Sequence, residues 1–210
     1  MDLPGILNAA VEEGFLTATA AKEGITHSEG FLCPVEDRPL LEPGGADLAI
    51  DLGTGGGLPG LVLAARTSAR WVLIERSERR FGFLVWATTE LGLGARVEVV
   101  NADAGLLAHS AYRGQALLVT ARSFASPAVT AEIGSAFLAV GSTLVISEPP
   151  SSGGTELRNR WPVSGIARLG LVDAGSWHTG RFGYQGLCCR TISRDGVPRS
   201  LNAITAKPMF

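Results

Sequence analysis

Long apolar runs and patterned cysteines are both missing from this chain of 210 residues. No segment approaches the roughly 18 to 20 consecutive apolar residues that a membrane-spanning helix requires. The first four residues lack the basic start of a signal peptide. Three cysteines, Cys33, Cys188 and Cys189, give neither a disulfide framework nor the spacing of metal ligands. We therefore expect a cytoplasmic protein with free thiols, no bound metal and no membrane partner.

The composition is that of a folded domain. Hydrophobic residues make up 46% of the chain and the mean hydropathy is +0.23, so a substantial core is expected. We expect a single domain over residues 1–210. It would comprise an N-terminal helical and loop extension (1–45) and a core with a C-terminal tail (46–210).

Charge is distributed unevenly along the chain. Residues 1–50 carry two basic and nine acidic side chains, a net charge of −7, whereas residues 151–210 carry eight basic and three acidic, a net charge of +5. A nucleic-acid partner would therefore meet the C-terminal third. A solvated arginine-rich face would have the same composition, so charge alone does not identify RNA.

Asp51–Gly60 is the most informative stretch, because five glycines and a proline stand between a predicted strand and a predicted helix. Glycine lets backbone N–H groups approach a ligand, as does the N-terminus of the following helix. The dinucleotide fingerprint G-x-G-x-x-G fails, since its third glycine would fall on Leu58. The pattern D-x-G-x-G fits at Asp51, Gly53 and Gly55 and resembles the first motif of Rossmann-like methyltransferases that use S-adenosylmethionine (AdoMet). Asp51 would then hold the methionine ammonium through water or the loop backbone; a glycine-rich turn without a ligand is the alternative.

Helices and strands are predicted to alternate along the core. Helices are expected at 4–16, 61–66, 78–91 and 127–140, and strands at 46–52, 70–75, 97–100, 117–121 and 143–147. This alternation predicts a parallel sheet with right-handed crossovers. Two further strands, at 166–172 and 185–193, are expected to form an antiparallel edge. Prolines at 34, 39 and 43 mark a loop-rich connector. His27 lies in that segment and is expected to be incidental; the alternative is that it approaches the mouth of the cofactor site. Residues 151–160 are expected to form a helix or a polar loop.

Polar residues follow three of the predicted strands. Glu75 ends the second strand, where an acid in a nucleotide-binding βαβ unit takes the ribose hydroxyls; a surface acid is the alternative. Asp103 follows the third strand and either accepts from an adenine amino group or caps a helix. Arg122 ends the fourth strand, where a guanidinium suits guanine acceptor atoms and phosphates; a structural ion pair is the alternative.

Four stretches of the chain carry a further resemblance. They are the loop Asp51–Gly60, the acid, basic residues and Phe-Leu pair of Glu75–Leu84, the stretch Val119–Ala125, and tail residues 197–199 with 205–209. They resemble the glucose-inhibited division protein B family, also called RsmG. Together they span about three-quarters of the chain. Members of this family methylate ring nitrogen seven of a guanine in bacterial small-subunit ribosomal RNA. The resemblance therefore implies AdoMet as the cofactor and ribosomal RNA or the small ribosomal subunit as the partner.

The resemblance also implies a fold and a set of site residues. The fold is α/β, of the Rossmann-like class I methyltransferase type, with a mostly parallel seven-stranded sheet flanked by helices and an antiparallel edge strand. The implied catalytic residue is Arg122, and the implied substrate-binding residues are Arg199 and Lys207. The implied cofactor-binding residues are Asp51, Gly53, Thr54, Gly55, Gly57, Pro59, Glu75, Arg76, Asp103, Ala104 and Arg122.

Departures from the family pattern concern the RNA side. Ser147-Glu148-Pro149 stands where the family has a basic turn. The N-terminal signature of the family is absent from this chain, and the tail of the family usually has more lysine than the tail of this chain. Two alternatives therefore remain, a paralogue that methylates a small molecule and an AdoMet-binding protein without catalysis. Because ring nitrogen seven of guanine has a free lone pair and no proton, methylation there needs positioning rather than a general base.

Overall fold

The computed structural model describes residues 1–33, 35, 39–41, 47–149 and 160–191. Arg199 and Lys207, and most of the expected helix or polar loop at 151–160, lie outside these residues. The helices are α1 (Leu3–Glu12), α2 (Ala18–Glu29), the short 3-10 turn η1 (Gly30–Leu32), α3 (Gly60–Arg66), α4 (Glu78–Glu90), α5 (Ala104–Leu107), α6 (Pro127–Phe137) and α7 (Val163–Arg168). The strands are β1 (Leu48–Leu52), β2 (Arg70–Glu75), β3 (Val97–Asn101), β4 (Ala116–Ala121), β5 (Leu138–Glu148), β6 (Leu171–Thr179) and β7 (Phe182–Cys189). None of the helices in these ranges is long and apolar enough to span a membrane.

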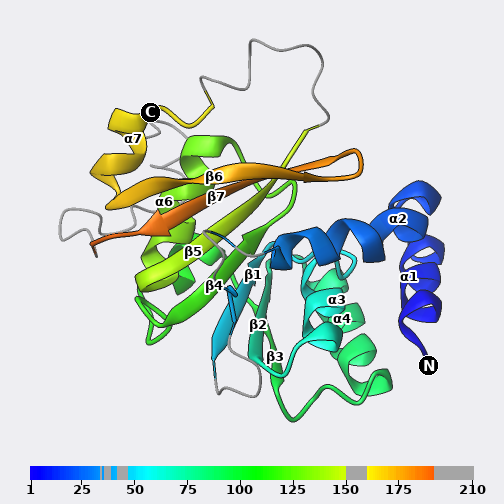
Figure 1. Cartoon of the computed structure of the whole chain (residues 1–210). Coiled ribbons are helices and arrows are strands. Elements are labelled where there is room, and N and C mark those ends of the chain that lie inside the picture. Colours follow the sequence, from blue (N-terminus) through cyan, green and yellow to red (C-terminus); the bar gives the residue numbers. More distant parts are fainter. Residues whose placement is uncertain (34, 36–38, 42–46, 150–159, 192–210) are drawn as a thin grey trace.

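Seven strands form one sheet in the order β3-β2-β1-β4-β5-β7-β6 (Figure 1). Strands β1 to β5 run parallel, and β7 pairs antiparallel with both β5 and β6. The predicted fold, a mostly parallel seven-stranded sheet with an antiparallel edge, is therefore confirmed. From β1 the chain builds outward through β2 and β3 and then returns to place β4 on the other side of β1. In open α/β sheets, ligands bind outside the carboxyl ends of the strands at such a reversal.

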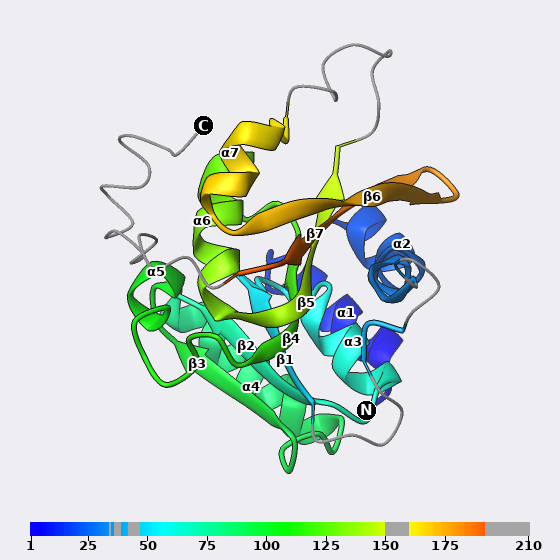
Figure 2. The ribbon, with the colours of Figure 1, turned by 60° about the vertical axis from the view of Figure 1, so that its left-hand side comes forward.

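Helices cover both faces of the sheet (Figure 2). Residues of α1, η1, α3 and α4 belong to the core on one face, and residues of α5, α6 and α7 to the core on the other. Along β2, Trp71 and Leu73 join the first core, whereas Val72 and Ile74 join the second. Successive side chains of a strand point to opposite faces, so a strand covered on both sides reads as a continuous apolar run.

The N-terminal region differs from its prediction. The expected helix at 4–16 ends before Gly14, which has φ +72°, and a second helix, α2, follows. His27 therefore lies on a helix rather than in the predicted loop-rich connector. The buried residues of α2 are Ala21, Gly24 and Ser28. Because these are small, α2 lacks the spacing of large apolar side chains that marks a helix in a sequence.

The C-terminal elements also differ from their prediction. The strand expected at 166–172 is wrong, because the chain forms α7, turns at Gly170 with φ +73°, and only then enters β6. A glycine with positive φ just after a helix is a common way for a helix to end. The helix expected at 127–140 stops at Phe137, where β5 begins at the next residue. The last strand, β7, begins at Phe182, three positions before the prediction.

Strand β6 forms one edge of the sheet that the described residues make. Its pairing with β7 shifts register between Asp173 and Ser176. Asp173 Oδ1 accepts hydrogen bonds from the Gly175 N–H at 2.8 Å and from Gln185 Nε2 at 2.8 Å. These contacts hold the irregular part of the edge strand against its neighbour.

Candidate active site

Asp51 anchors the glycine loop from inside the protein. Its side chain is fully buried, Oδ2 accepts the Gly60 N–H at 3.1 Å, and Oδ1 accepts the Thr120 hydroxyl at 2.7 Å. Burial raises the pKa of Asp51 to about 6, while hydrogen bonds from Thr120, Thr54 and Gly60 oppose the rise. The side chain of Asp51, on β1, thus connects β4 with the start of α3. It holds the glycine loop by a bond to the backbone N–H of Gly60.

Glu75, at the end of β2, binds the same glycine loop through its side chain. Its Oε2 accepts the Gly55 N–H at 2.9 Å and its Oε1 accepts the Ser77 N–H at 2.8 Å. The side chain of Glu75 is only 4% exposed. Gly53 and Gly55 take φ of +66° and +61°, conformations that glycine adopts readily. The carboxylate of Glu75 is therefore held in one place by a backbone donor of the glycine loop and by one that follows β2.

A cavity of about 310 Å³ opens beside Glu75. Asp103 also lines it, and its Oδ1 accepts the N–H groups of Gly105 at 2.8 Å and Leu106 at 3.2 Å, which caps α5. The helix-cap alternative for Asp103 is thus present together with its place in the cavity. This smaller cavity is lined by Gly53, Ile74, Glu75, Arg76, Arg80, Ala102, Asp103, Ala104, Gly105, Ser123, Phe124, Ala125 and Val129.

Helix α2 and the segment that joins it to α1 pack closely against the glycine loop. A Cβ added to Gly56 would come within 2.7 Å of Leu16 Cγ, and one added to Gly24 of α2 within 2.6 Å of Leu58 Cδ1. Leu58 packs in a small apolar cluster with Ala21 of α2. Close packing against Leu16 therefore explains why a glycine stands at position 56, which does not line the cavity beside Glu75.

A larger cavity, of about 550 Å³, lies at the carboxyl ends of β4 and β5. Helix α2 forms one wall through Glu23 and His27, and the β6–β7 hairpin contributes Arg181 and Phe182. The lining residues are Thr17, Thr19, Ala20, Glu23, His27, Ala121, Arg122, Ser123, Phe124, Ala125, Pro127, Thr130, Ile146, Ser147, Glu148, Pro149, Arg160, Trp161, Arg181 and Phe182.

Most charges in the larger cavity are paired. Arg160 Nε lies 2.7 Å from Glu148 Oε2, and Trp161 Nε1 donates to Glu148 Oε1 at 2.7 Å. Arg181 forms an ion pair with Glu23.

Arg122 is different. Within the part of the chain that the structure describes, it forms neither an ion pair nor a hydrogen bond. Burial lowers its pKa, because the half-buried guanidinium is partly stripped of water. The charge of Asp51 opposes this shift, but no carboxylate of the described residues lies at ion-pair distance from Arg122. A partly desolvated guanidinium without such a partner favours an anionic or hydrogen-bond-accepting ligand.

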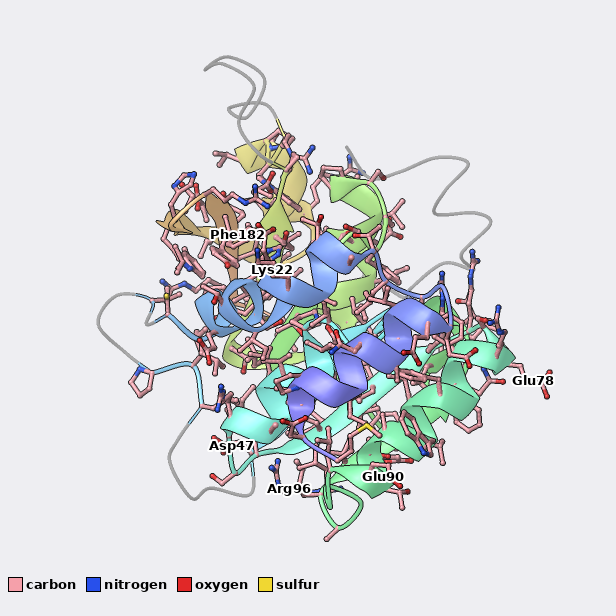
Figure 3. All side chains as sticks on the ribbon, turned by 90° about the vertical axis from the view of Figure 1, so that its right-hand side faces the viewer. Lys22, Asp47, Glu78, Glu90, Arg96 and Phe182 are labelled. Atoms are coloured by element: carbon pink, nitrogen blue, oxygen red, sulfur yellow. The ribbon has the colours of Figure 1, made fainter. Side chains whose placement is uncertain are left out.

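His27 is held as a neutral ring in the wall of the larger cavity. Its Nε2 lies 3.2 Å from Ser147 Oγ, and its ring stacks on Phe182 with centroids 4.2 Å apart. Figure 3 shows Phe182 beside α2, near the labelled Lys22. Burial, together with the charges of Arg122 and Arg181, lowers the pKa of His27 to about 4, although Glu23 opposes the shift. At neutral pH this imidazole is uncharged.

The residues predicted to bind the cofactor separate into groups. Those lining the smaller cavity are Gly53, Glu75, Arg76, Asp103 and Ala104, and Arg122 lines the larger one. The others belong to the loop itself: Asp51, Thr54, Gly55, Gly57 and Pro59. Sequence reasoning treated His27 as incidental, yet it lines the larger cavity, and it gave no site role to five other charged or aromatic residues there: Glu23, Arg160, Trp161, Arg181 and Phe182. They come from separate segments, and no motif joins them.

The donors and acceptors of the smaller cavity suit a nucleoside. The carboxylates of Glu75 and Asp103 are acceptors for hydroxyl and amino groups, and the glycine loop brings backbone close to the cavity. Within the described ranges no three His, Cys, Asp or Glu side chains are grouped to hold a metal ion.

A strand–glycine loop–helix at the reversal point of a seven-stranded sheet of this order defines the class I methyltransferase fold. A solved structure of geranyl diphosphate C-methyltransferase from Streptomyces coelicolor A3(2), in complex with S-adenosyl-L-homocysteine, has this fold. It superposes with a TM-score of 0.61 at 13% identity, over 82% of this chain and 78% of that one.

Sequence comparison then identifies the family. The family described as rRNA small subunit methyltransferase G, GidB, matches residues 37–150, more than half of the chain. The chain therefore belongs to this family, as its motifs predicted. Ribosomal RNA small subunit methyltransferase G from Acidiphilium cryptum is 47% identical over 87 residues, which are 41% of this chain and 37% of that protein. The protein of the same name from Clavibacter sepedonicus is 46% identical over 86 residues, 40% of this chain and 37% of that one. The matched region thus spans little more than a third of these relatives.

Proposed function

We propose that this chain is an AdoMet-dependent methyltransferase that acts on ring nitrogen seven of a guanine in small-subunit ribosomal RNA. The observation that carries the proposal is the pair of adjoining cavities at the carboxyl edge of the sheet. One offers the acids Glu75 and Asp103, and the other an unpaired guanidinium, Arg122. Membership in the GidB family supports the same activity and substrate, and supports a cytoplasmic location with the small ribosomal subunit as partner. Within the chain, we propose that residues 1–210 form the single domain expected from composition.

The smaller cavity would hold the cofactor. Glu75 would accept hydrogen bonds from the ribose hydroxyls, and Asp103 would accept from the adenine amino group through a carboxylate that already caps α5. Asp51 would act through the loop backbone that it anchors at Gly60. AdoMet, when bound, would supply an electrophilic methyl group, whose transfer to a nucleophile releases the sulfur as the neutral thioether of S-adenosylhomocysteine.

The larger cavity would hold the acceptor. The ionisable side chains that line it suit an acceptor atom that carries no proton. Glu148 and Glu23 are paired with arginines, and His27 is a neutral ring beside Ser147 with its pKa lowered to about 4. Among the described residues of this cavity there is therefore no free strong base. Arg122 would orient the acceptor through guanine acceptor atoms or a phosphate, and ring nitrogen seven would react through its own lone pair.

A small-molecule acceptor is the second candidate. It is favoured by the pairing of Arg160 with Glu148 and of Arg181 with Glu23, which leaves Arg122 as the one arginine of the described cavity lining without a carboxylate at ion-pair distance. Binding to an RNA backbone draws on a surplus of unpaired basic side chains. Arg199 and Lys207, the proposed substrate-binding residues, would supply such charges.

Labelled AdoMet and small ribosomal subunits lacking the methyl group test the proposal. We expect transfer of label to one guanine of the RNA, with a rate that falls as salt increases. Protein carrying Gly55→Val serves as the control without cofactor binding. Methylation of a neutral small molecule with no salt dependence, and none of ribosomal RNA, would establish the second candidate instead.

A further inference from the structure

The two cavities adjoin at one segment, the residues that follow β4. Ser123, Phe124 and Ala125 line both the cavity of about 310 Å³ and that of about 550 Å³, and no other described residue lines both. Under the proposed function, on which this inference rests, cofactor and acceptor occupy different cavities. Reacting atoms must come within about 3–3.5 Å of each other before transfer. They must therefore meet beside this segment.

The ring of Phe124 lies on the glycine loop at this junction. A Cβ added to Gly53 would come within 2.8 Å of Phe124 Cδ2, so the ring is in close contact with the loop backbone. Gly53 itself lines the smaller cavity. Phe124 is partly exposed and packs against the core cluster that contains the residues of α6. Its aromatic ring thus stands at the boundary of both spaces without being locked in the core.

The backbone at the junction has an unusual conformation. Ser123 has φ +52° and is the one non-glycine residue in the described ranges with positive φ. This turn follows Arg122, which lines the larger cavity, and precedes Phe124, which contacts Gly53. Non-glycine residues held in this conformation cluster at functional sites, because surrounding structure must maintain them. The turn at Ser123 therefore joins Arg122 of the larger cavity to Phe124, which lines both cavities and contacts the glycine loop.

We propose that Phe124 is a positioning residue that forms the partition between the two cavities. In the free protein its ring covers Gly53. The ring leaves the loop when the cofactor enters, and it then packs against the flat ring of the acceptor in the larger cavity. An aromatic side chain suits both positions, since it packs on backbone and stacks on a base. The partition would thereby favour cofactor binding before acceptor binding.

Two substitutions separate the two roles of the ring. Phe124→Ala removes the partition, so the association rate constant of S-adenosylhomocysteine should rise about tenfold, while kcat/KM for the acceptor falls about tenfold. Phe124→Leu fills similar space without an aromatic face, so association should stay near the wild-type rate while the acceptor KM rises. Phe182→Leu is the matched control for association, because Phe182 lines only the larger cavity. Stopped-flow mixing with S-adenosylhomocysteine measures the rates, and thermal unfolding checks each fold.

The outcomes distinguish this inference from the proposed function. A merely structural role would slow association or destabilise the protein, and it would not accelerate association. Unchanged or slower association in folded Phe124→Ala protein would overturn the partition, even with wild-type protein binding S-adenosylhomocysteine normally. Failure of the wild-type protein to bind S-adenosylhomocysteine would overturn the proposed function and this inference together.

Discussion

The smaller cavity is made by neighbouring loops of the sheet, whereas the larger cavity is assembled from segments far apart in the chain. Apart from the shared segment and Val129, the smaller one uses residues between Gly53 and Gly105. The larger one combines α2, the ends of β4 and β5, residues 160–161 and the β6–β7 hairpin. The first is organised by backbone donors such as Gly55 N–H, and the second by side-chain pairs such as Arg160 with Glu148. Substitutions outside the shared segment 123–125 should therefore affect one cavity without the other.

The largest effect is expected from Gly55→Val in the glycine loop beside the smaller cavity. Gly55 has φ +61°, a backbone conformation that a β-branched residue does not tolerate, and its N–H is bonded to Glu75. We expect the affinity for S-adenosylhomocysteine to fall by more than about a hundredfold, measured by calorimetry. Gly82→Val is the matched control, since a Cβ at Gly82 on α4 meets nothing within 4 Å. Equal affinities of the two variants would contradict the assignment of this loop to the cofactor.

Glu75→Ala should weaken the binding of the cofactor without affecting the larger cavity. Loss of charge-assisted hydrogen bonds of roughly 1.5–3 kcal/mol corresponds to about a ten- to hundredfold higher Kd. Glu75→Gln keeps one acceptor oxygen and should lie between alanine and wild type. Titration calorimetry with AdoMet measures each Kd. An unchanged Kd in a folded Glu75→Ala protein would place the ribose elsewhere.

Arg122→Ala should have the converse effect. Removing the unpaired guanidinium should lower kcat/KM for the acceptor by about tenfold or more, because positioning is lost, while the Kd for AdoMet changes little. Arg66→Ala is the control, because Arg66 pairs with Glu29 on the surface and lines neither cavity. A large loss of AdoMet affinity in Arg122→Ala would show that this residue serves the cofactor, and the two cavities would then be less separate than their geometry indicates.

The smallest effect is expected in the pH dependence of stability. The pKa of His27 is lowered from 6.5 to about 4, so the unfolded chain takes up this proton first, and the stability that neutral His27 contributes is lost as pH falls from 6.5 toward 4. The raised pKa of Asp51 acts oppositely, with stability falling as pH rises from about 4 to about 6.

His27→Asn should remove only the first of these contributions. When the pH is lowered from 7 to 4.5, the unfolding free energy of the wild type should fall by about 1 kcal/mol more than that of the variant, after allowance for solvent screening. Denaturant titrations at both pH values measure the difference. His178→Asn, at an exposed position of β6, is the control. A difference independent of pH would mean that His27 does not titrate as its surroundings dictate.

The same contrast decides what could be predicted from the sequence. The glycine loop, the parallel strands and the place of Glu75 depend on short patterns, since a strand, a turn and a helix follow one another directly. Helix α2 was not predicted, because it packs through Gly24 and Ala21 rather than through large apolar residues. The region before β6 was assigned to a strand because apolar residues continue across Gly170, and the turn there depends on the positive φ of that glycine.

The larger cavity could not be predicted because its partners are distant in the chain. Glu23 and Arg181 are 158 positions apart, and the contact of His27 with Ser147 spans 120 positions. Such pairs are set by how α2 and the hairpin pack on the finished sheet. Arg122 was found because it directly follows β4, whose end the sequence did locate.

The irregular edge of the sheet has a consequence for association between molecules. A regular outer strand presents a row of unpaired backbone groups onto which another chain can add. In β6 the register shift between Asp173 and Ser176 interrupts that row, and Asp173 directs its carboxylate to Gly175 and Gln185 of its own sheet. The exposed carboxylate of Asp173 and the bulge both oppose strand addition at this edge. The β6 edge is thus a poor template for pairing with the sheet of another molecule.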